Sequence, residues 1–180
     1  MSSFAVIGLG NTLRGDDGIG IVLIEKLAEE RKKLPENVEL IDGGTGGFNL
    51  IHSLSKFEKI LIIDALDFHA SPGSYKFFKL TEEHLKTKSV HIDSHERDFL
   101  KVIALLREIG TLPKIFVFGI QPKDTSYKLR ISKELDERIN HFIDVLHEKI
   151  LFILPSRKTL LMTLRGYKQI FTSRMAKSSI

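Results

Sequence analysis

The stretch KILIIDAL, residues 59–66, most narrows the choice of fold. It is an apolar run that ends at Asp64, without the alternation of a strand exposed on one face. Strands of this kind are covered on both faces, which is typical of parallel sheets flanked by helices. The stretch therefore predicts a central strand of a parallel sheet.

Strands and helices alternate along the rest of the chain. Apolar runs predict further strands at residues 4–9, 38–42 and 114–120. The segment SPGSYKFFKL, residues 71–80, is typical of a turn and a further strand nearer the sheet edge. Helical spacing of apolar residues predicts helices at 18–34, 94–110 and 132–151, and a short helix near 48–54. This alternation indicates an α/β fold: a single three-layer domain with a twisted, mostly parallel central sheet of about five strands and helices on both faces. We assign this domain to residues 1–154 and a basic C-terminal tail to residues 155–180.

Composition excludes several function classes. The net charge of +4 comes from the tail, since the rest of the chain has 21 basic and 23 acidic residues. A nucleic-acid-binding protein would need a basic face on the domain itself. The sequence has no cysteine, which excludes disulfides, thiolate zinc sites and a cysteine nucleophile. The N-terminus does not resemble a signal peptide, and no segment has the roughly 20 apolar residues of a membrane span. We expect a cytoplasmic protein.

Polar, glycine-rich segments follow three predicted strands: GNTLRGDDG (10–18), DGGTGG (42–47) and DALD (64–67). Ligands of such sheets bind beyond the carboxyl ends of the strands. Asp17 and Asp64 are expected to project there toward one crevice. His91, Asp93 or His95, from VHIDSHERD (90–98), could add a third ligand. Two carboxylates and one imidazole suit a divalent ion such as zinc or nickel.

Other interpretations of these residues remain open. Gly8 and Gly10 give the start of a dinucleotide-binding fingerprint, but Leu13 stands where its third glycine should be. Asp16 is the better candidate of the two adjacent aspartates to cap the following helix. Asp42 could bond the amides of the glycine turn after it, and His95 could be a solvated loop residue. Asp64 ends a buried strand and needs a partner, a metal or a raised pKa.

Five segments in order resemble one known family: GLGNTLRGDDGIG, LPENVELIDGGTGG, ILIIDALDF, SHERDFLKVIALL and FVFGIQP. They are similar to the nickel–iron hydrogenase maturation endopeptidases, over roughly residues 4–150. The resemblance implies an enzyme that removes the C-terminal extension of a hydrogenase large-subunit precursor after nickel insertion. The alternative is a maturation chaperone that binds nickel-loaded precursor without cleaving it.

The resemblance also implies site residues. Its metal-binding trio falls on Asp17, Asp64 and His95, and Asp17 is within the range that the family accepts at the first position. The metal is nickel, supplied by the precursor, although zinc could occupy the same site. As a hypothesis, Asp17 and Asp64 are catalytic: one of them, or a water held at the metal, starts the attack on the scissile carbonyl. Substrate contacts fall on Asp42, Gly43, Gly44 and Thr45. We expect a monomer whose partner is the precursor, without nucleic acid or stable membrane insertion.

Overall fold

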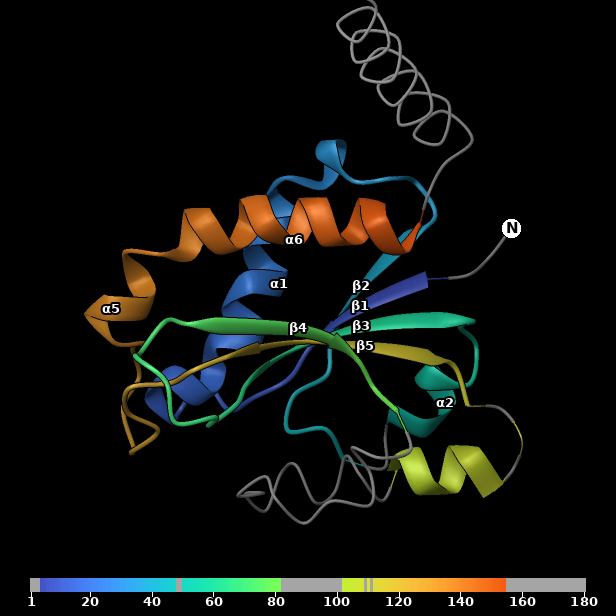
Figure 1. The fold of residues 1–180 in the computed structure, drawn as a ribbon, viewed down its shortest axis with the longest axis horizontal. Helices are drawn as coiled ribbons and strands as arrows, with labels where there is room; N and C mark the ends of the chain where they lie inside the picture. Colours follow the sequence, from blue (N-terminus) through green and yellow to red (C-terminus); the bar gives the residue numbers. More distant parts are fainter. Residues whose placement is uncertain (1–3, 48–49, 82–101, 109, 111, 155–180) are drawn as a thin grey trace, which may run out of the picture. The chain divides into compact units, whose positions relative to one another are not determined.

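The central sheet has the predicted form. A computed structural model describes residues 4–47, 50–81, 102–108, 110 and 112–154. Its five strands have the order β2-β1-β3-β5-β4 (Figure 1). Their bounds are β1 Phe4–Gly8, β2 Val38–Asp42, β3 Lys59–Ala65, β4 Tyr75–Lys79 and β5 Lys114–Ile120. Only β4, at an edge, is antiparallel among these strands. The KILIIDAL strand is therefore central, as predicted.

The helices differ from the prediction in two places. Their bounds are η1 Gly15–Gly18, α1 Ile19–Glu29, η2 Arg31–Lys33, α2 Leu50–Leu54, a helix at 102–108, α5 Lys133–Asp136 and α6 Ile139–Ile153. The single helix expected at 132–151 is two helices, because the Arg138 N–H bonds the Leu135 carbonyl three residues back and tightens the chain there. The helix expected at 18–34 ends at Glu29, and a separate 3-10 turn precedes Pro35.

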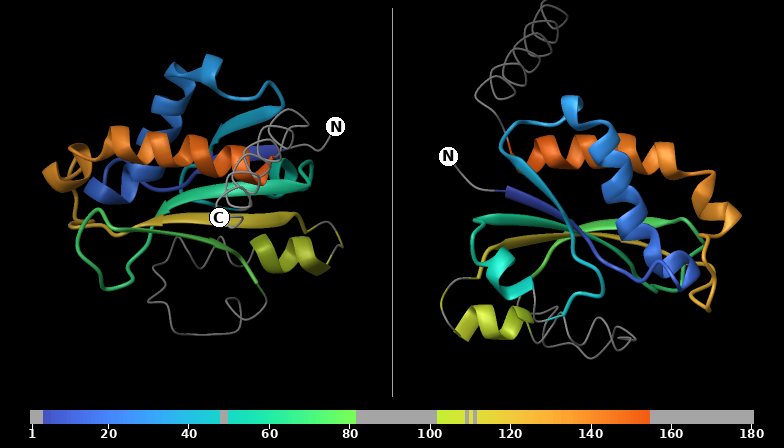
Figure 2. Two further views of the ribbon diagram at one scale, coloured as in Figure 1. Left: turned by 45° about the horizontal axis from the view of Figure 1, so that its top comes forward. Right: turned by 180° about the vertical axis from the view of Figure 1, so that it is seen from behind.

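Helices cover both faces of the sheet. The strand register puts Ala5 beside Ile60, so alternate residues of β1 and β3 share a face. That face packs against α2 and the helix at 102–108 in one buried cluster. Figure 2 shows α1 on the opposite face, and there Phe142 at the start of α6 packs edge-on against Phe118 of β5. This is the expected three-layer order.

The chain divides into two compact units, Met1–Val145 and Leu146–Ile180, and the site described below lies in the first. The predicted tail, 155–180, lies outside the described residues. Within the described part, no helix combines the length and apolar character that a membrane crossing requires.

Candidate functional site

Glycines bring the start of α1 directly against the carboxyl ends of two strands. A Cβ atom on Gly20 would lie 2.2 Å from the carbonyl oxygen of Leu9 and 2.4 Å from that of Ile63. A Cβ atom on Gly8 would lie 2.2 Å from the Gly20 carbonyl oxygen. Only residues without a side chain allow this approach. The segment before α1 is thereby held at the edge of the sheet where β1 and β3 end.

Gly10 turns the chain back so that Asp17 lies beside the end of β1. Its φ of 134° is unfavourable for other residues, and a Cβ atom there would lie 1.8 Å from the carbonyl oxygen of Asp17. The N–H of Asn11 donates to Asp17 Oδ2 at 2.9 Å. The half-buried Asp17 carboxylate is thus fixed on the loop. The backbone of Asp17 fills the space beside Gly10 that a nucleotide phosphate would need. Helix α1 begins only at Ile19, beyond the glycines, so this loop does not have the form of a dinucleotide-binding loop.

The glycine loop after β2 is bonded to the same place. The N–H of Gly43 donates to the Gly8 carbonyl at 2.9 Å, and the N–H of Gly10 donates to the Gly44 carbonyl at 2.8 Å. Asp42 Oδ1 accepts the N–H of Gly44 at 2.9 Å, which confirms the predicted bond from Asp42 to its own turn. Asp42 and Thr45 remain exposed. Three of the four predicted substrate-contact residues, Asp42, Gly43 and Gly44, therefore lie beside the end of β1, and Thr45 follows them.

Asp64 is the second-to-last residue of β3, at this same edge. Its half-buried carboxylate accepts the Ala65 N–H at Oδ1, 2.8 Å away. The preceding residue, Ile63, accepts the Leu9 N–H at 2.8 Å, which ties the end of β3 to the loop that carries Asp17. Asp42 and Asp64 thus lie at the ends of β2 and β3, and Asp17 lies in the loop after β1, the strand between them.

The third predicted ligand, His95, lies outside the described residues, as do His91 and Asp93. Within the described part of the chain, no group of three His, Asp or Glu side chains is arranged to hold a metal ion. The described residues do include two half-buried carboxylates, Asp17 and Asp64, at one edge of the sheet. Two carboxylates fit a divalent ion whose remaining ligands come from another molecule. The trio with His95 stays a prediction.

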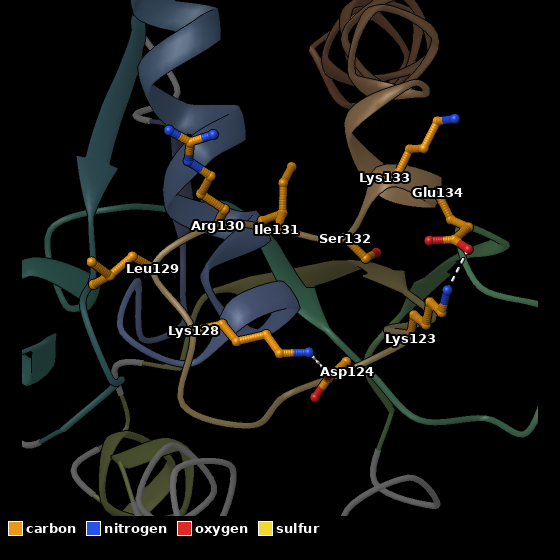
Figure 3. A pocket seen from close by; sticks show the side chains of 9 residues that line it. All are labelled: Lys123, Asp124, Lys128, Leu129, Arg130, Ile131, Ser132, Lys133 and Glu134. Atoms are coloured by element: carbon orange, nitrogen blue, oxygen red, sulfur yellow. Dashed lines mark hydrogen bonds and ion pairs between the residues drawn. The ribbon is translucent and has the colours of Figure 1, made fainter.

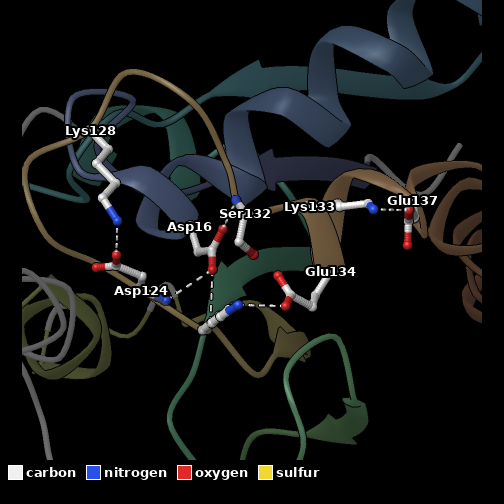
Figure 4. Close-up of polar contacts among 8 residues, drawn as sticks. Asp16, Asp124, Lys128, Ser132, Lys133, Glu134 and Glu137 are labelled. Atoms are coloured by element: carbon white, nitrogen blue, oxygen red, sulfur yellow. Dashed lines mark hydrogen bonds and ion pairs between the residues drawn. The ribbon is translucent and has the colours of Figure 1, made fainter.

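Asp16 has a role that the sequence did not suggest. Its fully buried carboxylate accepts three backbone N–H groups: those of Lys123 at 2.8 Å and Asp124 at 3.1 Å on Oδ2, and that of Ser132 at 2.5 Å on Oδ1 (Figure 4). The prediction that Asp16 caps α1 is wrong, because no side chain caps that helix and its N-cap residue is Gly18. Asp16 instead anchors the segment 123–132, called here the anchored loop.

Gln121 is a second residue that sequence reasoning missed. Its buried side chain accepts the N–H groups of Phe68 at 2.9 Å and Ala70 at 3.2 Å through Oε1. Its Nε2 donates to Asp67 Oδ1 at 3.1 Å. One amide therefore shapes the segment that follows Asp64. A polar residue directly after the buried strand β5 was the available signal, since buried polar groups need partners.

Comparison with known proteins gives the family. The family model for hydrogenase maturation proteases matches residues 21–149. The chain belongs to this family. A hydrogenase expression/formation protein, HupD, of Bradyrhizobium diazoefficiens is 32% identical over 120 residues, which are 66% of this chain and 62% of that protein. The family resemblance predicted from the five segments is confirmed.

Solved structures of this family share the fold. The hydrogenase maturating endopeptidase HybD from E. coli superposes with a TM-score of 0.69 at 26% identity, over 80% of this chain and 89% of that one. The hydrogenase 2 maturation peptidase from a Thaumarchaeota archaeon has a TM-score of 0.62 at 26% identity, over 83% and 98% of the two chains. The predicted α/β sheet fold is confirmed. The matches to HupD and to the HoxM protein of Azotobacter vinelandii span about three fifths of those curated relatives, at 62% and 58% of their lengths.

Proposed function

We propose that this protein is the endopeptidase that removes the C-terminal extension of a nickel–iron hydrogenase large-subunit precursor after nickel insertion. Membership of the hydrogenase maturation protease family carries the proposal. The HybD protein of similar fold is named a hydrogenase maturating endopeptidase. The cytoplasm, where the precursor would be assembled, is the proposed location, and the monomer is the proposed state.

The carboxylates at the sheet edge supply the recognition. Nickel is part of the substrate here, and Asp17, Asp64 and His95 are its proposed ligands. Asp17 Oδ2 is occupied by the Asn11 N–H, and no described group bonds its Oδ1, which is the oxygen available to a metal. The exposed Asp42 and Thr45, with Gly43 and Gly44, are the proposed contacts for the precursor chain, and the bonds from Gly43 to Gly8 and from Gly10 to Gly44 support this.

Peptide cleavage needs a water, a base and a proton donor. In the proposed step one of the two carboxylates, Asp17 or Asp64, accepts a proton as the water oxygen bonds to the scissile carbonyl carbon. The carbon–nitrogen bond then breaks, and the same proton passes to the leaving amine. Because both side chains are half-buried, they can meet a substrate carbonyl without first being uncovered.

Asp64→Asn tests this proposal. The change removes a negative oxygen but nearly keeps the size of the side chain. We expect processing of nickel-loaded precursor, followed by the mass of the shortened large subunit, to fall at least 100-fold. Asp136→Asn, an exposed aspartate of α5, is the matched control and should process at the parent rate. An Asp64→Asn protein as fast as the parent would contradict the proposed role.

The precursor assay also separates cleavage from simple binding. The parent protein is incubated with precursor in the presence and absence of nickel. The protease shortens the nickel-loaded chain only, whereas a maturation chaperone would bind it and leave its mass unchanged. If the precursor forms a complex with the protein but keeps its full length, the proposed endopeptidase activity would be wrong and the chaperone would be favoured.

A further inference from the structure

The anchored loop is bonded to the segment just before Asp17, residue by residue. The N–H of Lys128 donates to the Leu13 carbonyl at 3.0 Å, and the N–H of Gly15 donates to the Lys128 carbonyl at 2.7 Å. Arg14 Nε donates to the Thr125 carbonyl at 3.1 Å. With the three bonds to Asp16, the loop and the turn that presents Asp17 form one hydrogen-bonded unit.

This unit exposes large apolar side chains. Tyr127 and Leu129 of the anchored loop are 84% and 80% exposed, and Leu13, bonded to the loop through its backbone, is 51% exposed. Tyr127 and Leu129 flank Lys128, whose N–H bonds Leu13, so the three exposed side chains come from one short stretch of backbone, which is typical of a protein interaction site. Tyrosine and arginine are also the residue types enriched at the centres of such sites.

The same loop is basic. It borders a surface pocket of about 730 Å³ lined by Lys123, Asp124, Lys128, Leu129, Arg130, Ile131, Ser132, Lys133 and Glu134, which has four cations and two carboxylates (Figure 3). Lys123 pairs with Glu134 at 2.5 Å, and Lys128 pairs with Asp124. The hydrogen bond from Lys128 holds the pKa of Asp124 well below its usual range.

Arg130 provides the charge that a partner can use. It is exposed, and it has no hydrogen-bond or ion-pair partner among the described residues. Figure 3 shows Arg130 and Leu129 projecting away from the two paired lysines. A free guanidinium beside an exposed leucine favours a ligand that offers both a carboxylate and an apolar group, because guanidinium binds carboxylates in a fixed fork.

We propose that the anchored loop is a docking surface for an acidic segment of the hydrogenase precursor that also carries apolar side chains. The proposal rests on the proposed function. Asp16 acts as a positioning residue: it fixes the loop to the turn that carries Asp17, so a segment docked on the loop is held at a set distance from the carboxylates. A polypeptide fits better than a small anion, since the exposed tyrosine and leucine offer contact area that a small anion cannot use.

Two variants test the docking surface, Arg130→Glu and Leu129→Ser. Both positions are exposed, so the variants should fold, as thermal unfolding can verify. Lys32→Glu on η2 and the exposed Leu112→Ser, 41% exposed in the parent, are the matched controls. We measure the Kd of nickel-loaded precursor by titration, and KM and kcat for its shortening at low and moderate salt.

We expect Arg130→Glu to raise Kd and KM about tenfold at low salt, with a smaller effect at higher salt, and kcat to stay within about twofold. Leu129→Ser should raise both several-fold at either salt concentration. Precursor that binds the two variants as it binds the parent would overturn the docking surface, whether or not cleavage occurs. If the parent binds precursor without shortening it and the variants bind more weakly, the docking surface stands and the endopeptidase fails.

Discussion

Asp16 and Asp17 are neighbours in sequence, and the structure predicts opposite consequences for the same change at each. We consider Asp16→Asn and Asp17→Asn, which nearly keep side-chain volume and remove one charged oxygen. Asp16 is fully buried and accepts three backbone N–H groups, whereas the half-buried Asp17 accepts one. The first change should affect the free energy of unfolding, and the second should affect processing.

The magnitude for Asp16→Asn follows from its hydrogen bonds. If the new amide nitrogen replaces Oδ1, it faces the N–H of Ser132, and two donors oppose each other. Loss of that charge-assisted bond costs about 1.5–3 kcal/mol, and the bonds from Lys123 and Asp124 weaken because their acceptor is neutral. The other orientation loses two bonds. We therefore expect a loss of about 3 kcal/mol, which lowers the melting temperature of a domain of this size by about 6–12 °C.

Asp17→Asn loses less because its oxygen bonds one N–H, that of Asn11, at a half-buried position. We expect a cost of about 1 kcal/mol and a melting temperature within about 4 °C of the parent. Processing of nickel-loaded precursor should fall at least 100-fold. Thermal unfolding by circular dichroism, together with the precursor assay below the melting temperature, measures both. A parent-like melting curve for Asp16→Asn, or a larger loss for Asp17→Asn, would refute the assignment.

Three further predictions concern the glycines, Gln121 and the tail. Gly10→Ala should cost at least about 3 kcal/mol, because its Cβ would lie 1.8 Å from the Asp17 carbonyl oxygen at a φ of 134°. Gly44→Ala is also at positive φ, but no described residue beyond its chain neighbours comes within 4 Å of an added Cβ, so it should cost about 1 kcal/mol; equal urea-unfolding losses would contradict this. Gln121→Leu should cost about 2 kcal/mol by urea unfolding, since two N–H groups lose their acceptor, and no change would show that other groups satisfy them. A chain ending at Leu154 should process precursor at the parent rate, because the family resemblance ends near residue 150; slower processing would give the tail a role.

The strands could be predicted because their signal is local. Runs such as KILII at 59–63 are apolar throughout, and only a strand covered on both faces accounts for such a run in an α/β pattern. Asp42 was also predictable, since its bond reaches only two residues along the chain to Gly44. The position of Asp17 and Asp64 at one edge of the sheet followed from the rule that parallel strands end at one edge. Their convergence on one ligand stays a prediction.

The anchored loop could not be predicted, for a physical reason. Asp16 bonds backbone N–H groups more than 100 residues away, at Lys123, Asp124 and Ser132. Every residue except proline has a backbone N–H group, so the residue types at these positions do not show that they bond Asp16. The helix break near Arg138 is similar, because it arises from a backbone bond to Leu135 and not from a glycine or proline. The local pattern of apolar residues therefore predicts helices and strands, but it does not predict backbone hydrogen bonds between distant segments of the chain.

The short helix η1 explains why the adjacent carboxylates of Asp16 and Asp17 contact different parts of the protein. A 3-10 helix has three residues per turn, so successive side chains point about 120° apart. Within Gly15–Gly18, Asp16 is therefore directed into the protein, where it meets the loop amides, while Asp17 is directed toward the end of β1 and bonds Asn11. The 3-10 turn thus fixes the anchored loop and Asp17 to the same few backbone atoms, and a displacement of one must displace the other.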